Sequence, residues 1–176
     1  MTDYRPGLDG VIATESSISD INGKKGILSY RGYSIEELAQ KSTFEETSYL
    51  LLTGELPTKS QLSSFTKKIN RKRDLPPKLL SLLENLPKNS NPMDVLQLGV
   101  SSLGSFYPIK FDPEELKANL YKEDYFLDIS ASLIGSIGSI VVAWNRIKQN
   151  KNYIKPKDNL SYAENFMHML DDSIKT

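Results

Sequence analysis

The sequence predicts an all-α, mostly helical fold with a small β-hairpin near its N-terminus. Two observations predict the helices: helix-start signals recur along the chain, and the apolar residues between them follow helical spacing. A third predicts the hairpin, because Asn22-Gly23 lies between two strand-like segments and is typical of a tight turn. We expect two parts, an N-terminal segment with the hairpin in residues 1–33 and a helical portion in residues 34–176.

Several segments carry recognisable helix starts. Four fit a capping box, in which a hydroxyl accepts from the amide three residues on while an acidic or amide side chain reaches back. These four begin at Ser34, Thr43, Thr58 and Ser161. Two more starts place proline at the first helical position, after Asn91 and after Asp112. From the second of these, the helical pattern continues to about Gln149.

The composition narrows the classes of function. The 176 residues include 22 basic and 22 acidic side chains, so charge gives no reason to expect a nucleic acid or a membrane surface as partner. The absence of cysteine excludes a disulfide framework, a thiolate zinc site and a cysteine nucleophile. The opening "MTDYRPGLDG" lacks the pattern of a signal peptide, and a cytoplasmic protein is therefore expected.

The second half of the predicted long helix carries no formal charge between residues 129 and 145. Six of these seventeen residues are Ser or Gly, which favours a buried helix over a membrane span. Small side chains also recur at every fourth position, at Ala131, Gly135, Ser139 and Ala143. Such a face lets another helix approach closely, either within the chain or across a subunit interface, and the pattern leaves both open.

Two further clusters of charged residues are candidates for a functional site. Lys67–Arg73 holds five cations in seven residues, but without interleaved aromatics a solvated helix end is favoured over a nucleic-acid site. Glu164, His168 and Asp172 share a helical face and could hold a metal ion, although pairing on a solvent-facing stripe explains them as well. With one histidine, the residues predict no catalytic, cofactor-binding or metal-binding centre.

The order of six segments carries a more specific signal. They read "PGLDGVIATESSIS", "DINGKKGILSYRGYSIEELA", "TFEETSYLLLTGELPT", "NPMDVLQLGVSSLG", "IVVAWNRIKQN" and "LSYAENFMHML". Together they resemble the N-terminal half of the citrate synthase family, most closely the shorter bacterial enzymes that share their framework with 2-methylcitrate synthases. The resemblance implies that residues 34–176 are the N-terminal portion of the family's helical large domain. Two positions depart from the family: Asn91, where many relatives have histidine, and "GSIGS", where proline is frequent.

The resemblance implies an enzymatic activity whose catalytic residues this chain does not contain. The family condenses acetyl-CoA with oxaloacetate to citrate and CoA without a cofactor, using an aspartate and two histidines from its C-terminal half. None of those motifs is present, and His168 lies upstream of them, so no catalytic residue is carried over and the chain alone is expected to be inactive. The alternatives are a truncated paralogue acting as an interaction module, one half of a split enzyme, or a 2-methylcitrate synthase using propionyl-CoA.

The resemblance also implies a homodimer. In family dimers, the helices that match "NPMDVLQLGVSSLG" and "IVVAWNRI" contribute to the subunit interface. Ala131, Gly135, Ser139 and Ala143 are therefore expected as dimer contacts.

Overall fold

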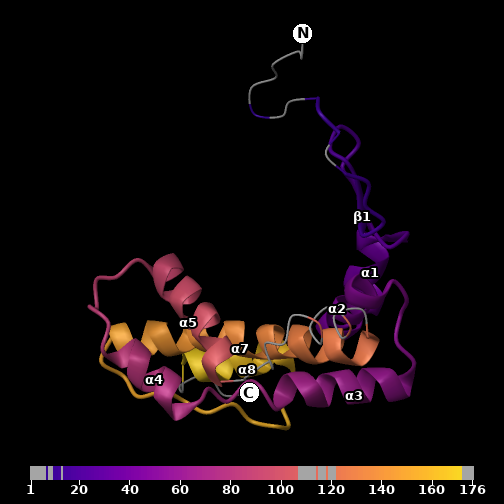
Figure 1. Cartoon of the computed structure of the whole chain (residues 1–176). Coiled ribbons are helices and arrows are strands. Elements are labelled where there is room, and N and C mark those ends of the chain that lie inside the picture. Colours follow the sequence, from indigo (N-terminus) through magenta and orange to yellow (C-terminus); the bar gives the residue numbers. More distant parts are fainter. Residues whose placement is uncertain are drawn as a thin grey trace. The chain divides into compact units, whose positions relative to one another are not determined.

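A computed structural model describes residues 7, 10–12, 14–106, 114, 118 and 122–171. They form helices and a small antiparallel sheet, which confirms the predicted fold class (Figure 1). The chain divides into two compact units, Met1–Leu56 and Pro57–Thr176, and each is described by itself.

Unit 1 contains the sheet and two short helices. The strands are β1 (Ser19–Asn22), β2 (Ile27–Tyr30) and β3 (Tyr33–Ser34), paired antiparallel in the order β1-β2-β3. The helices are α1 (Ile35–Lys41) and α2 (Phe44–Thr53). Its sheet carries one strand more than the predicted hairpin.

The turns of this sheet differ from the predicted tight turn at Asn22-Gly23. Asn22 pairs with Ile27, so β1 and β2 are joined by four residues. The Asn22 side chain accepts a hydrogen bond from the Lys25 amide at 3.1 Å, and Gly26 supplies the positive φ, at 66°. The two-residue turn lies instead between β2 and β3, at Arg31 (φ 51°) and Gly32 (φ 88°). Two successive positive φ angles are what a type I′ hairpin turn requires, and Gly32 meets that requirement without strain.

Arg31 links the sheet of unit 1 to α2. Its Nη2 donates to the carbonyl oxygen of Leu51 in α2 at 2.9 Å, and its Nη1 donates to Ser17 Oγ at 2.7 Å. In addition, α1 packs on β2 and β3. The sheet, α1 and α2 are thus held together, and the division falls between Leu56 and Pro57.

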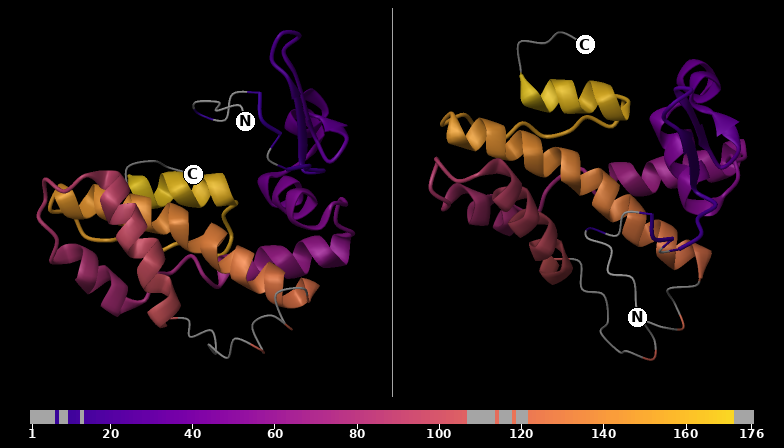
Figure 2. Two further views of the ribbon diagram at one scale, coloured as in Figure 1. Left: turned by 45° about the horizontal axis from the view of Figure 1, so that its top comes forward. Right: turned by 90° about the horizontal axis from the view of Figure 1, so that it is seen from above.

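Unit 2 is built around one long helix. It comprises α3 (Lys59–Asn70), α4 (Pro77–Glu84), α5 (Pro92–Phe106), α7 (Glu123–Lys148) and α8 (Tyr162–Leu170). The central helix α7 contacts α3, α4, α5 and α8, and Figure 2 shows α8 (yellow) running alongside it (orange).

Most predicted helix starts are confirmed. Reciprocal capping boxes begin α2, α3 and α8, at Thr43, Thr58 and Ser161, while the Ser34 side chain accepts from the Glu37 amide at the start of α1. Pro92 is the first residue of α5. The start expected after Asp112 lies outside the described residues, and α7 ends at Lys148, close to the predicted Gln149.

The main core of unit 2 forms where α4 and α5 meet α7. Its members are apolar and almost fully buried: Leu75, Leu79, Leu83, Val95, Leu103, Ile140, Ala143, Trp144 and Ile147. By length and composition alone, α7 (the stretch 124–148) could cross a membrane. However, four helices of the same unit pack against it, and this is the environment of a core helix.

Candidate functional site

The small-residue face of α7 lies inside unit 2. Ala131, Ser139 and Ala143 have no exposed surface. A Cβ atom at Gly135 would lie 2.6 Å from the carbonyl oxygen of Ile69, at the end of α3. Packing within one chain therefore accounts for the small side chains here, and contact of these four residues with a second subunit stays a prediction.

Polar atoms of α7 strengthen the crossings with α3 and α8. Ser136 Oγ donates to the Lys72 carbonyl oxygen at 3.1 Å. The Tyr162 hydroxyl of α8 donates to the Ile134 carbonyl oxygen at 2.8 Å, and a Cβ at Gly138 would lie 3.0 Å from that hydroxyl. At Gly135 the backbone of Ile69 leaves no room for a larger side chain, whereas at Gly138 a side chain would require the Tyr162 hydroxyl to shift.

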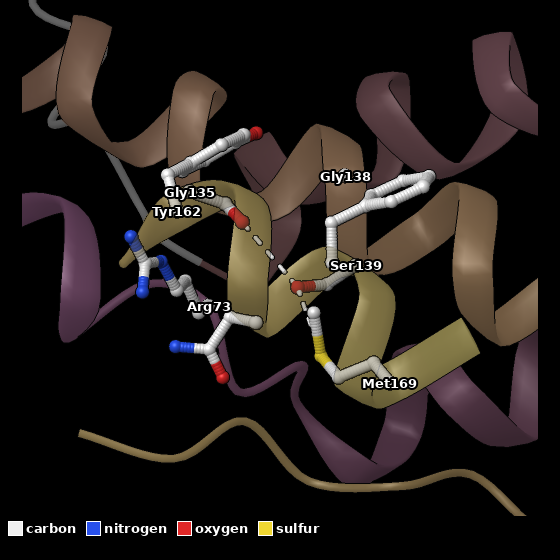
Figure 3. A pocket seen from close by; sticks show the side chains of 8 residues that line it. Arg73, Gly135, Gly138, Ser139, Tyr162 and Met169 are labelled. Carbon is white, nitrogen blue, oxygen red and sulfur yellow. Dashed lines mark hydrogen bonds between the residues drawn. The ribbon is translucent and has the colours of Figure 1, made fainter. Parts of the chain in front are cut away.

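A small pocket marks the meeting of α7, α8 and the segment after α3 (Figure 3). In it, Ser139 Oγ donates to the Gly135 carbonyl oxygen at 3.4 Å and approaches Met169 Sδ at 3.9 Å. The lining residues are Arg73, Gly135, Gly138, Ser139, Tyr162, Asn165, Phe166 and Met169. Its volume of about 10 Å³ is room for no more than one water molecule, so it is a packing gap and not a substrate site.

Arg73 is the cation of this pocket and is 3% exposed. Its Nη1 donates to the Leu160 carbonyl oxygen at 3.3 Å, and its guanidinium carbon lies 5.0 Å from the centre of the Tyr162 ring. The cation therefore ties the segment after α3 to the start of α8. In this respect the Lys67–Arg73 run differs from the solvated helix end expected from the sequence.

Glu164, the first residue of the stripe that also contains His168, has a structural role at the start of α8. The Glu164 side chain accepts from the Ser161 amide at 2.8 Å and closes the capping box of α8. Hydrogen bonds from the Ser161 side chain and then its backbone hold the pKa of Glu164 below the ordinary value. His168 is half-buried on α8, and Asp172 lies outside the described residues. Among the residues that the structure describes, no group of three His, Cys, Asp or Glu side chains could hold a metal ion.

The opposite face of α7 was missed by the sequence reasoning. Phe126, Leu133, Ile137 and Val141 each expose between 37% and 40% of their surface. Their spacing of seven, four and four residues places them on one side of the helix. That spacing was the signal that could have revealed a second, outward-facing apolar stripe.

Comparison with known proteins assigns the family. A family model described as citrate synthase, C-terminal domain, matches residues 7–176. The chain belongs to the citrate synthase family. It is 39% identical to the citrate synthase of Acidithiobacillus ferridurans over 95% of this chain and 42% of that protein. It is 38% identical to the citrate/2-methylcitrate synthase of Bacillus subtilis over 95% of this chain and 43% of that protein.

A solved citrate synthase structure agrees with this family assignment. The crystal structure from Pyrobaculum aerophilum matches with a TM-score of 0.82 and 37% identity, covering 93% of this chain and 41% of that one. The chain thus spans about two fifths of the length of the citrate synthases it matches.

Proposed function

We propose that this chain is the N-terminal part of a citrate synthase, whose complete form condenses acetyl-CoA with oxaloacetate to give citrate and CoA. The observation that carries the proposal is the family match over residues 7–176, which corresponds to only 42% of a curated relative. In this role, α7 and the helices packed on it form part of the scaffold that supports the reaction.

The chain by itself is proposed to be inactive. The expected mechanism needs two histidines and an aspartate, whereas the whole sequence contains one histidine. That histidine lies on α8, next to a glutamate already used in the capping box. Enolisation of a thioester needs an acid and a base held together in a closed site, and one imidazole cannot fill both histidine roles.

An assay of CoA release tests this point. The purified 176-residue chain is mixed with acetyl-CoA and oxaloacetate, and free thiol is followed with a chromogenic disulfide. We expect no release above the rate without protein, while a complete citrate synthase serves as the positive control. Turnover by the chain alone would show that it carries a catalytic centre of its own.

The identity of the acyl donor in the complete enzyme is a finer question. Acetyl-CoA is proposed because the relative from Acidithiobacillus ferridurans is named citrate synthase. The Bacillus subtilis relative is named for both citrate and 2-methylcitrate, and it keeps propionyl-CoA as the alternative donor. The cytoplasmic location also stays a prediction, since relatives from plants include peroxisomal and glyoxysomal enzymes.

We further propose that the complete protein is a homodimer that uses the outward face of α7. The family resemblance implies a dimer through this helix. Four of its exposed residues are large and apolar and share one side of the helix: Phe126, Leu133, Ile137 and Val141. Burial of such side chains is favourable by about 25 cal/mol per Å² of apolar surface.

The same face supports the second candidate function, an interaction module that binds a full-length synthase. Co-purification of this chain with the intact enzyme tests this function, and failure to co-purify contradicts it.

A further inference from the structure

The connection between β1 and β2 contains the only Asn-Gly pair of the sequence, Asn22-Gly23. Residues 22–26 are all exposed. Among the residues that the structure describes, none forms a hydrogen bond with the backbone amide of Gly23. A Cβ atom at Gly23 would have nothing within 4 Å, so the space around this residue is open. The amide nitrogen is therefore available to react with a neighbouring side chain.

The side chain of Asn22 is held over this turn by Lys25. Its Oδ1 accepts from the Lys25 amide at 3.1 Å, and the same amide donates to the Asn22 carbonyl oxygen at 3.1 Å. Attack of a nucleophile on Asn22 Cγ would place negative charge on Oδ1. A backbone N–H that already points at this oxygen stabilises that charge as it develops. The turn thus supplies both a nitrogen that can attack and a donor for the oxygen of the group that is attacked.

We propose that Asn22 is a site of spontaneous deamidation. The Gly23 nitrogen loses its proton and bonds to Asn22 Cγ, while the Cγ–Nδ2 bond breaks and Nδ2 leaves with that proton as ammonia. The resulting cyclic succinimide takes up one water molecule from the solvent. The ring opens at one of its two carbonyl carbons, which gives either aspartate or isoaspartate. No atom is oxidised or reduced, and the reaction is independent of the proposed condensation chemistry.

Other asparagines of the chain lack one of these features. Asn89 is also exposed, but the amide of the next residue, Ser90, donates to the Pro87 carbonyl oxygen at 2.9 Å. That hydrogen bond has to break before the nitrogen can attack, and the side chain of Ser90 adds bulk beside it. Asn165 is fully buried, and its side-chain oxygen and nitrogen are both hydrogen-bonded. These contrasts predict a faster reaction at Asn22 than at either of the other two.

Deamidation at this position changes both the charge and the backbone of unit 1. Either product replaces a neutral amide by a carboxylate in a chain that has no net charge. Isoaspartate also routes the backbone through Cγ, which inserts one more atom at the end of β1. Because Asn22 pairs with Ile27 there, the added atom should disturb the last pair of the β1–β2 ladder.

Peptide mapping by mass spectrometry tests the proposal on the full 176-residue chain, incubated at mildly alkaline pH. Conversion of Asn22 is expected to be at least about tenfold faster than conversion of Asn89. An isoaspartate-specific carboxyl methyltransferase, supplied with a labelled methyl donor, should label the peptide that contains residue 22. Equal rates at the two asparagines, or no conversion at Asn22, would overturn the proposal.

Incubation of the chain in urea separates the effect of the fold from that of the sequence. Unfolding releases the Ser90 amide from its hydrogen bond, so conversion should accelerate more at Asn89 than at Asn22. An equal acceleration at both asparagines would contradict the part that the fold plays in the proposal.

A variant of Gly23 tests which nitrogen attacks. Gly23→Ala places a side chain beside the attacking nitrogen and is expected to slow the conversion of Asn22 about tenfold or more. The fold accommodates this change, because the φ of Gly23 is not positive and its Cβ position is open. The matched control is Gly104→Ala in α5, which has equally open space and should leave the conversion of Asn22 unchanged. Circular dichroism verifies that both variants fold, and an unchanged rate in Gly23→Ala would contradict attack by this nitrogen.

Discussion

The two faces of α7 are both poor in charge, yet they have opposite environments. Ala131, Ser139 and Ala143 on the inward face have no exposed surface, whereas Ile137 and Val141 on the outward face expose 38% and 40%. The inward side chains are small because other helices of the same chain cross there. The outward side chains are large and keep more than a third of their surface exposed. The comparison indicates that small side chains on α7 lie where another element crosses it closely, whereas the opposite face keeps large apolar side chains partly exposed.

The largest expected effect is a substitution on the inward face, at Gly135. A Cβ there would lie 2.6 Å from the backbone oxygen of Ile69, which cannot move without shifting the end of α3. Gly135→Leu should therefore lower the free energy of unfolding by roughly 3 kcal/mol or more, as measured by denaturant titration followed by circular dichroism. The matched control, Val141→Leu on the outward face, should change it by less than about 0.5 kcal/mol. Equal stabilities of the two variants would contradict the packing described for α7.

A smaller effect is expected where α5 crosses α7. A Cβ at Gly99 would lie 2.9 Å from Cγ2 of Ile140, a side chain atom that can give way in part. Gly99→Ala should cost about 1–3 kcal/mol by thermal or denaturant unfolding. The cost should be smaller in an Ile140→Val background, because valine lacks Cδ1, which lies 3.2 Å from the same Cβ position, and leaves room for the side chain to shift. Gly104→Ala is the control on the same helix, because nothing lies within 4 Å of its Cβ position. There alanine should stabilise by about 0.5–1 kcal/mol, and a loss at Gly104 as large as that at Gly99 would rule out the crossing as the cause.

On the outward face, a charge should alter assembly and leave the fold intact. Ile137→Lys is expected to change the free energy of unfolding by less than about 1 kcal/mol, since the side chain is 38% exposed. The same substitution should reduce the molar mass of the assembled protein in light scattering, because a charge would have to be buried in the interface. An unchanged mass in Ile137→Lys would show that α7 does not use this face for self-association.

The smallest effect concerns pH and the start of α8. The pKa of Glu164 is lowered in the folded chain, chiefly by hydrogen bonds from Ser161. A carboxyl whose folded pKa is depressed contributes stability that is present above its unfolded pKa and is lost as pH falls through the folded pKa. Ser161→Ala should raise the pKa of Glu164 towards its ordinary value and flatten the acid side of the stability profile, as followed by NMR titration of the carboxyl carbon. Glu164→Gln is the control without a titrating group, and an unshifted pKa in Ser161→Ala would mean that the Ser161 side chain does not perturb this carboxyl.

The sequence predicted features that depend on neighbouring residues better than features that depend on packing. The capping boxes at Thr43, Thr58 and Ser161 were found because each is complete within four residues. The hairpin shows the limit of local reasoning. Asn22-Gly23 is a good tight-turn dipeptide, but strand pairing placed the two-residue turn at Arg31-Gly32.

What surrounds the small-residue face of α7 and Arg73 could not be predicted from the spacing of residues in the sequence. Residues at every fourth position share a helical face, but periodicity does not say what covers that face. Gly135 is explained by its closeness to the backbone of Ile69, which lies 66 positions earlier in the sequence and is brought there by the fold. The burial of Arg73 against Tyr162 has the same origin, since the two residues belong to different elements.

The most direct test of the account is a chimera in which residues 7–176 replace the matched segment of the Acidithiobacillus ferridurans citrate synthase. If this chain is the N-terminal part of a citrate synthase, the chimera will release CoA from acetyl-CoA and oxaloacetate while the 176-residue chain alone does not. A chimera that folds cooperatively and has the mass of the parent enzyme, yet releases no CoA, would contradict that claim.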